Sequence, residues 1–262
     1  MIRFLRRAAV WLIVLYAIYV SALVWLHPYL LYQFDKVPYE VPGWQHHVLD
    51  GADVPVSISF RKGRSDKPII LFFMGNAGNL RAFVPLLNVQ MKTGATVVAL
   101  NYRGGAGRPG IPSEDVLKSD ALRAYDYVVR NIASTGQKVV LHGYSLGSGL
   151  AMHVASAREA DGMVLTAPFF RLCEVMTAQS FAPACFVPGV QRWDNAAVMG
   201  KISMPTLVMH GTADTVIPFE QGQRLARRLS SAHFETFEGE GHWSLVCDPD
   251  YERALWSFLA QF

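Results

Sequence analysis

The sequence is poor in cysteine and, over most of its length, has no excess of either charge. Its 262 residues include only three cysteines, and neither these nor the eight histidines fall at the short spacings of a zinc site, so no metal is expected. Without the three N-terminal arginines, the chain carries 21 basic and 21 acidic residues, which leaves no basic surface for nucleic acid. The glycine-rich stretch GNAGN lacks the Lys-Ser/Thr of a phosphate-binding P-loop.

Charge is missing altogether from residues 8–26, AAVWLIVLYAIYVSALVWL. A helix over these 19 residues would be about 28 Å long, which nearly spans the hydrocarbon core of a bilayer. Arg3, Arg6 and Arg7 precede the run and no acidic residue occurs in the first 26, so the positive-inside rule predicts a cytoplasmic N-terminus and an exported domain, periplasmic if bacterial. A cleavable signal peptide fits the same pattern. A retained anchor is favoured, because no clear small-x-small cleavage site follows the run.

The chain therefore divides into three expected parts: a signal anchor or transmembrane helix at 1–27, a juxtamembrane linker at 28–45, and one globular domain at 46–262. In an exported domain, a disulfide between Cys173 and Cys185 is compatible with their spacing, which does not decide the matter.

Strand and helix patterns alternate along the globular domain. This order predicts an α/β fold, with a mostly parallel sheet flanked by helices on both faces. The expected strands are a hairpin formed by 45–49 and 54–60 around the turn 50–53, then 67–73, 95–104, 137–144, 161–168, 204–211 and 232–239. The expected helices are about 80–92, 113–133, 146–158, 219–230 and 250–261.

Residues able to perform nucleophilic and acid–base chemistry follow the ends of these strands, where ligands bind in open α/β sheets. Ser145 ends one strand, Asp214 follows another, and His242 lies just beyond the last. A serine hydroxyl is a weak nucleophile unless a base accepts its proton and a carboxylate orients that base. His242 and Asp214 can supply these two roles, in the chain order Ser, Asp, His.

The pentapeptide Gly-x-Ser-x-Gly around Ser145 would arise by chance in about one chain in ten of this length. The prediction therefore depends on the expected strand before Ser145 and the expected helix after it. Gly143 and Gly147 would permit a tight strand-to-helix turn, and the backbone N–H of Leu146 would be free at the start of the helix. Simpler interpretations are a strand-end serine and a turn-capping Asp214. For His142 and His210, either a hydrogen-bonded place in the core or a supporting place behind the site is expected.

Several stretches resemble the α/β-hydrolase family, over about residues 46–262. HGYSLGSG is similar to its nucleophile elbow, MPTLVMHGTADTVIP to its acid-bearing strand and turn, and GEGHW to its histidine loop. GNAGN followed by NYRGGAGRPG narrows the likeness to a branch of short-lidded, membrane-anchored serine hydrolases that includes depalmitoylase-like members. The resemblance implies the α/β-hydrolase fold, with Asn76 and Leu146 as the two oxyanion-hole donors. This chain has Met74-Gly75 where the branch commonly has His-Gly, a change that spares the backbone donor at Asn76.

The residues predict a serine hydrolase that needs no cofactor and cleaves carboxylic esters or thioesters through an acyl-enzyme. Residues 169–203 are expected to form a short lid, whose apolar side chains either receive an acyl chain or only pack the lid onto the domain. The expected partners are a small-molecule or lipid-like acyl ester or thioester and, through the N-terminal helix, a membrane, but no nucleic acid. The alternatives are an acyl-protein thioesterase or depalmitoylase, a peptidase, or a non-catalytic binding module.

Overall fold

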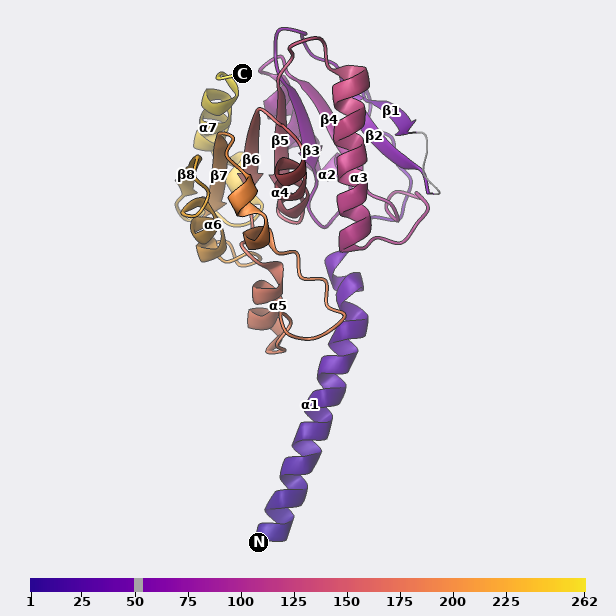
Figure 1. The fold of residues 1–262 in the computed structure, drawn as a ribbon, viewed down its shortest axis with the longest axis vertical. Helices are drawn as coiled ribbons and strands as arrows, with labels where there is room; N and C mark the ends of the chain where they lie inside the picture. Colours follow the sequence, from indigo (N-terminus) through magenta and orange to yellow (C-terminus); the bar gives the residue numbers. More distant parts are fainter. Residues whose placement is uncertain (50–53) are drawn as a thin grey trace.

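The computed structural model describes residues 1–49 and 54–262, so the predicted hairpin turn at 50–53 lies outside the described residues. An eight-stranded sheet forms the centre of the described domain, with the spatial order β1-β2-β4-β3-β5-β6-β7-β8 (Figure 1). The strands are β1 (Gln45–Leu49), β2 (Val56–Arg61), β3 (Ile69–Phe73), β4 (Thr96–Asn101), β5 (Val139–Tyr144), β6 (Gly162–Thr166), β7 (Thr206–Gly211) and β8 (Ala232–Phe237).

The sheet is mostly parallel, as the sequence predicts. β1 pairs antiparallel with β2, and β2 pairs antiparallel with β4, whereas every further neighbour from β4 to β8 is parallel. The central strand β3, IILFF, is buried along its whole length, because helices cover both faces of a parallel sheet. The parallel strands therefore all end at one edge of the sheet, and the candidate site residues follow these strand ends.

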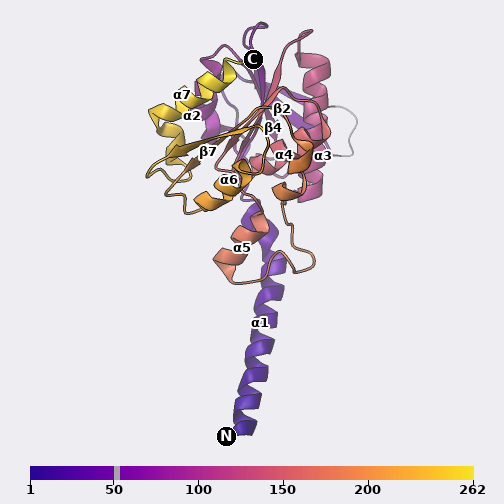
Figure 2. The ribbon, with the colours of Figure 1, turned by 60° about the vertical axis from the view of Figure 1, so that its left-hand side comes forward.

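Helices cover both faces of the sheet. α3 packs against α4 on one face, and α2 packs against α7 on the other (Figure 2). An ion pair of 3.1 Å between Lys92 and Glu252 joins the end of α2 to α7. The α-helices are α1 (Ile2–Leu31), α2 (Leu80–Met91), α3 (Glu114–Tyr127), α4 (Gly147–Ala157), α5 (Leu172–Ser180), α6 (Phe219–Ala226) and α7 (Pro249–Leu259), and the shorter turns are η1 (Val128–Ile132), η2 (Asn195–Ala197), η3 (Met199–Lys201) and η4 (Ser244–Cys247).

Local signals fix where the domain helices begin and end. Ser113 caps α3 by accepting a hydrogen bond from the Val116 N–H at 3.4 Å, as its place before two acidic residues indicates. The predicted helix 113–133 is α-helical only to Tyr127. Its last turn widens into a π-helix, in which the Ala133 N–H donates to the Val128 carbonyl at 2.9 Å.

α1 is an exposed rod that projects from the domain (Figure 1). It is long and apolar enough to cross a membrane. The helix continues through Pro28 to Leu31, beyond the expected boundary at residue 27. Proline lacks the N–H that would bond to the Val24 carbonyl four residues earlier. The His27 side chain donates to that carbonyl instead, at 2.6 Å through Nδ1, so the helix passes the proline without an orphaned acceptor.

The segment after α1 runs back across the edge of the sheet that carries the strand ends. The Tyr32 and Phe34 side chains are buried. The Asp35 N–H donates to the Ala77 carbonyl at 3.1 Å. The Tyr39 hydroxyl accepts from the Leu80 N–H at 2.6 Å, at the start of α2. The linker is therefore fastened to the loop between β3 and α2.

Candidate active site

Ser145 occupies a strained turn between β5 and α4. Its backbone has φ of 51°, the left-handed region that side chains other than glycine seldom adopt. A Cβ at position 143 would lie 2.6 Å from the Ser148 Cα, and one at position 147 would lie 2.0 Å from the Phe73 carbonyl oxygen. Gly143 and Gly147 therefore permit the close approach that presents Ser145 at the strand end, as the sequence predicts.

The structure brings Ser145, His242 and Asp214 together in one hydrogen-bonded chain. The His242 Nε2 lies 2.9 Å from the Ser145 Oγ, and its Nδ1 lies 2.7 Å from the Asp214 Oδ2. All three side chains are buried: Ser145 lies in the turn after β5, Asp214 in the loop after β7 and His242 in the loop after β8. Because the carboxylate can only accept, the His242 Nδ1 carries the proton and its Nε2 is free to accept one from the serine.

The Asp214 carboxylate is held by hydrogen bonds on both oxygens. Oδ1 accepts from the Val216 and Ile217 N–H groups at 2.8 and 2.9 Å. Oδ2 lies 3.2 Å from the His210 Nε2, in addition to its bond with His242. Burial alone would raise the pKa of Asp214, but the hydrogen bonds from the two histidines outweigh it and hold that pKa well below its usual range. The carboxylate is therefore charged and fixed in orientation.

His210 and His142 are both buried, and only His210 contacts the candidate triad directly. His210, on β7, contacts Asp214 and also lies 3.0 Å from the Ile217 carbonyl. His142, on β5, lies between Gln90 and Thr166, at 2.6 and 3.0 Å. Burial lowers the pKa of His142 to about 3, so its ring is neutral at ordinary pH.

Tyr144 positions the histidine loop, a role that the sequence analysis missed. Its hydroxyl donates to the His242 carbonyl, and its ring stacks on Trp243 with centroids 5.0 Å apart. Burial raises the pKa of Tyr144, so the hydroxyl remains a donor. The sequence places Tyr144 next to Ser145, which was the one signal available. It could not show the partner of Tyr144, because His242 lies 98 residues further along the chain.

Asn76 and Leu146 lie in the positions that follow β3 and β5. Gly75, next to Asn76, adjoins the nucleophile loop, because a Cβ there would lie 3.5 Å from the Ser145 Cβ. Leu146 is the N-cap residue of α4. Within the described part of the chain, neither the Asn76 nor the Leu146 backbone N–H donates to a protein acceptor. Two backbone donors near Ser145 are therefore available to a ligand.

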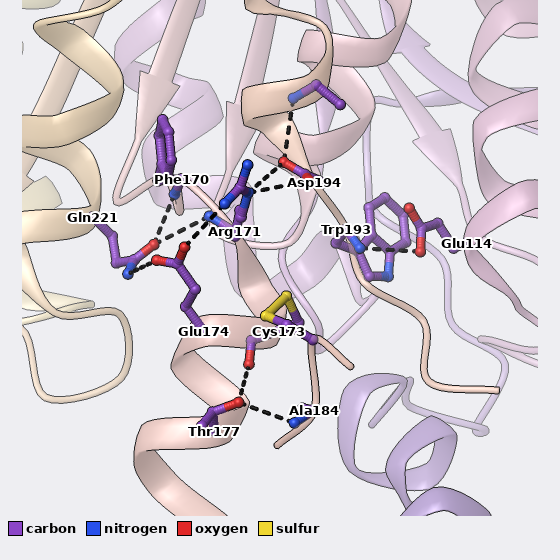
Figure 3. The surroundings of a disulfide bond; sticks show 12 residues. Glu114, Phe170, Arg171, Cys173, Glu174, Thr177, Ala184, Trp193, Asp194 and Gln221 are labelled. Carbon is purple, nitrogen blue, oxygen red and sulfur yellow. Dashed lines mark hydrogen bonds and ion pairs between the residues drawn. A yellow bond between two sulfur atoms is a disulfide. The ribbon is translucent and has the colours of Figure 1, made fainter. Parts of the chain in front are cut away.

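The segment between β6 and β7 is partly packed into the domain and partly exposed. At its base, Trp193 is fully buried and its backbone N–H donates to the Glu114 carboxylate at 3.0 Å (Figure 3). Ion pairs join Arg171 to Asp194 at 3.1 Å and Arg224 to Glu174 at 2.6 Å. At its tip, Phe181 and Phe186 are exposed.

A disulfide joins Cys173, in the first turn of α5, to Cys185 in the following loop (Figure 3). The two Cα atoms are 5.0 Å apart. The Thr177 hydroxyl supports the same turn, because it donates to the Cys173 carbonyl at 2.9 Å and accepts from the Ala184 N–H at 3.0 Å. The pairing that the sequence left open is therefore formed.

The order of the strands, the strained elbow at the end of β5 and the loops after β7 and β8 together define the α/β-hydrolase fold. Comparison with known proteins agrees. The family described as serine hydrolase (FSH1) matches residues 114–243, a range that includes Ser145, Asp214 and His242. An esterase from Pyrococcus furiosus superposes with a TM-score of 0.70 at 16% identity, over 87% of this chain and 95% of the esterase.

Two relatives extend the likeness to lipases and membrane proteins. Lysophosphatidylserine lipase ABHD12 from Danio rerio is 30% identical over 182 residues, which are 62% of this chain and 47% of the lipase. An uncharacterized membrane protein from Saccharomyces cerevisiae is 26% identical over 71% of this chain and 72% of its own length. The chain has the α/β-hydrolase fold, and its sequence is similar to serine hydrolases and lipases. It spans about half the length of the curated lipases that it matches.

Proposed function

We propose that this protein is a membrane-associated serine hydrolase that cleaves lipid-like carboxylic esters with Ser145, His242 and Asp214. The observation that carries the proposal is the hydrogen-bonded chain of 2.9 and 2.7 Å that links these side chains, at a serine held in a strained elbow. This arrangement activates the weakly nucleophilic serine hydroxyl, because the base and the carboxylate that orients it are already in place.

In the first half of the reaction, the Ser145 Oγ attacks the ester carbonyl carbon while the His242 Nε2 takes the hydroxyl proton. The carbonyl oxygen becomes an oxyanion, which the Asn76 and Leu146 N–H groups receive. When the intermediate collapses, the bond to the leaving alcohol breaks and His242 returns the proton to the alcohol oxygen. Ser145 then carries the acyl group.

In the second half, a water molecule attacks the acyl-enzyme carbonyl, and His242 accepts a proton from that water. Collapse of the second intermediate releases the carboxylic acid and returns the proton to the Ser145 oxygen. Asp214 holds the Nδ1–H of His242 throughout and stabilises the imidazolium that forms twice in each cycle. No step requires a cofactor.

The lipid-like substrate class is supported by the relatives described as lysophosphatidylserine lipases and by the long apolar helix α1. Thioesters share the same carbonyl chemistry. A comparison of palmitoyl thioesters with the matching oxygen esters separates an acyl-protein thioesterase from a lipid esterase.

We propose that α1 spans the membrane with its N-terminus in the cytoplasm and the hydrolase domain on the other side. Arg3, Arg6 and Arg7 favour this orientation. The disulfide between Cys173 and Cys185 also favours it, because such bonds persist in oxidising compartments.

Cys247 is exposed and unpaired, so it can report the topology. A membrane-impermeant maleimide should label it in intact cells, and Cys247→Ala should abolish that labelling. Labelling that requires permeabilised cells would instead place the domain in the cytoplasm.

Hydrolysis of p-nitrophenyl esters by the full chain in lipid nanodiscs tests the proposed activity. Ser145→Ala should lower kcat/KM by about 10⁴-fold or more, because the nucleophile is lost. Ser148→Ala is the matched control, since Ser148 lies in the first turn of α4, close to Ser145, and its buried hydroxyl has no partner among the described residues. A Ser145→Ala variant as active as the wild type would contradict the proposed nucleophile. A folded wild type that resists both esters and fluorophosphonate labelling would favour a binding module.

A further inference from the structure

A cavity of about 270 Å³ lies between the N-terminal helix α1 and the segment that follows β6. We call it the anchor cavity. The two views place α5 and the following loop beside α1 (Figures 1 and 2). The helix wall includes Val20, Leu23, Val24 and Leu31, and the opposite wall includes α5 and the loop after it. Of the side chains that line the cavity, only His27, Gln179 and Ser180 are polar.

Hydrogen bonds fix the two walls of the anchor cavity to each other. The Tyr16 hydroxyl donates to the Phe181 carbonyl at 2.9 Å, and the Tyr19 hydroxyl donates to the Ser180 carbonyl at 2.7 Å. Further along α1, the Gln191 N–H donates to the His27 Nε2 at 3.2 Å. These contacts extend from Tyr16 to His27, about 16 Å along the helix axis. Specific hydrogen bonds therefore hold α1 in place as one wall of the anchor cavity.

Both walls continue into the loops that carry the proposed catalytic groups. On one side, the Gln179 amide donates to the Val216 carbonyl at 3.1 Å, and the Val216 N–H donates to the Asp214 carboxylate at 2.8 Å. On the other side, the chain leaving α1 reaches the loop after β3, where the Asp35 N–H bonds to Ala77. The anchor cavity therefore lies near the edge of the sheet at which the parallel strands end, the edge that also carries Ser145.

The surface around the anchor cavity suits hydrocarbon better than water. Residues 175–191 contain no charged side chain. Phe181 and Phe186 are 84% and 85% exposed, and the apolar stretch of α1 is unburied. Exposed apolar side chains on two neighbouring segments are typical of a surface that contacts a membrane or a partner. The hydrogen bond from Tyr16 places Phe181 beside the middle of the uncharged run 8–26, and so at the depth of the lipid chains if that run spans the bilayer.

We propose that the anchor cavity binds the acyl chain of a monoacyl lipid ester drawn from the surrounding bilayer, with α1 supplying one wall. The inference rests on the proposed ester hydrolysis and adds the substrate class. The aliphatic lining selects a hydrocarbon chain. The volume of about 270 Å³ lies just below the ~300–1,000 Å³ typical of ligand pockets, which favours one chain over two.

A tryptophan introduced at Leu23 would fill the anchor cavity from the helix side. Leu26→Trp is the matched control, because Leu26 lies one turn away on the same helix, is exposed and does not line the cavity. The assay measures kcat/KM for p-nitrophenyl laurate and p-nitrophenyl acetate with the full chain in phospholipid nanodiscs. In Leu23→Trp, the laurate-to-acetate ratio should fall by at least about tenfold, the discrimination that a single methylene can give in an apolar pocket. In Leu26→Trp, the ratio should match that of the wild type.

An unchanged ratio in Leu23→Trp, with wild-type hydrolysis intact, would overturn the acyl-chain assignment and leave the proposed function standing. If the wild type hydrolyses neither ester, the proposed function fails instead, and the cavity is tested by photo-crosslinking. The probe is a 1-O-alkylglycerol, the non-hydrolysable ether analogue of a monoacylglycerol, with a diazirine in its alkyl chain. It should label residues 182–190 in the wild type and in Leu26→Trp, and much less in Leu23→Trp. Equal labelling in all three chains would exclude the cavity as the binding site.

Discussion

The buried histidine of strand β5 should make the stability of the folded chain fall as the pH is lowered from about 6.5 toward about 3. Burial lowers the pKa of His142 from 6.5 to about 3, and the ring is fully buried, so solvent does not screen the effect. The folded state therefore favours the neutral ring, whereas the unfolded chain takes up a proton near pH 6.5. This contribution to stability is fully present above pH 6.5 and is lost as the pH falls toward 3.

The size of the effect follows from the two pKa values of His142. One pKa unit corresponds to about 1.4 kcal/mol, so protonation of the unfolded chain at about pH 5 should lower the free energy of unfolding by about 2 kcal/mol. Asp214 contributes little in this window, because its pKa is lowered from 3.8 and it titrates at more acidic pH. Burial also lowers the pKa values of His46 and His153, which add to the slope in any variant that retains them.

Equilibrium unfolding in urea of the detergent-solubilised full chain, followed by tryptophan fluorescence, measures this dependence. His142→Gln keeps one donor and one acceptor for Gln90 and Thr166 but cannot titrate. Whatever its stability at neutral pH, its loss of stability on acidification should be about 2 kcal/mol smaller than that of the wild type. An equal loss in the two chains would refute the assignment of the pH dependence to His142.

Three further perturbations test the elbow, the disulfide and the acid. Gly147→Ala should destabilise the fold by at least about 3 kcal/mol in urea unfolding, because the added Cβ would lie 2.0 Å from the Phe73 carbonyl oxygen. Its control is Gly200→Ala, where an added Cβ would meet open space, and stability should change by less than about 0.5 kcal/mol. Replacing both Cys173 and Cys185 by alanine should cost about 3 kcal/mol in the same assay by loss of loop-closure entropy, and Cys247→Ala should be near neutral. Asp214→Asn should lower kcat about 10⁴-fold in ester hydrolysis, and Asp66→Asn, in an exposed ion pair, should leave it unchanged. Equal effects in a variant and its control would contradict the corresponding assignment.

The fold and the residues brought together at Ser145 could be predicted because their signals are local. The apolar run of β3 and its place between helical segments specify a buried parallel strand. Chain order and strand-end placement were enough to select Ser145, Asp214 and His242 from many serines, acids and histidines. Parallel strands that end at one edge of a sheet then bring such residues together without further information.

The supporting contacts could not be predicted, because they depend on side-chain geometry between distant segments. The hydrogen bond from Tyr144 to the His242 carbonyl requires the path of the loop after β8. The second histidine on the Asp214 carboxylate requires the orientation of the His210 ring. No periodicity or spacing in the sequence reports either of these.

The packing of the N-terminal helix against the domain was the largest structural feature that the sequence did not predict. Its uncharged run indicates a membrane span, and a span needs no specific contact with the domain that it anchors. The structure nevertheless places the hydroxyls of Tyr16 and Tyr19 on backbone carbonyls of the segment after β6. In hydrocarbon, an unpaired hydroxyl or carbonyl costs several kcal/mol, so these pairs satisfy groups that lipid could not. The same tyrosines would be unremarkable in a cleaved leader. Their pairing with the domain therefore favours a retained helix, which the proposed acyl-chain site requires.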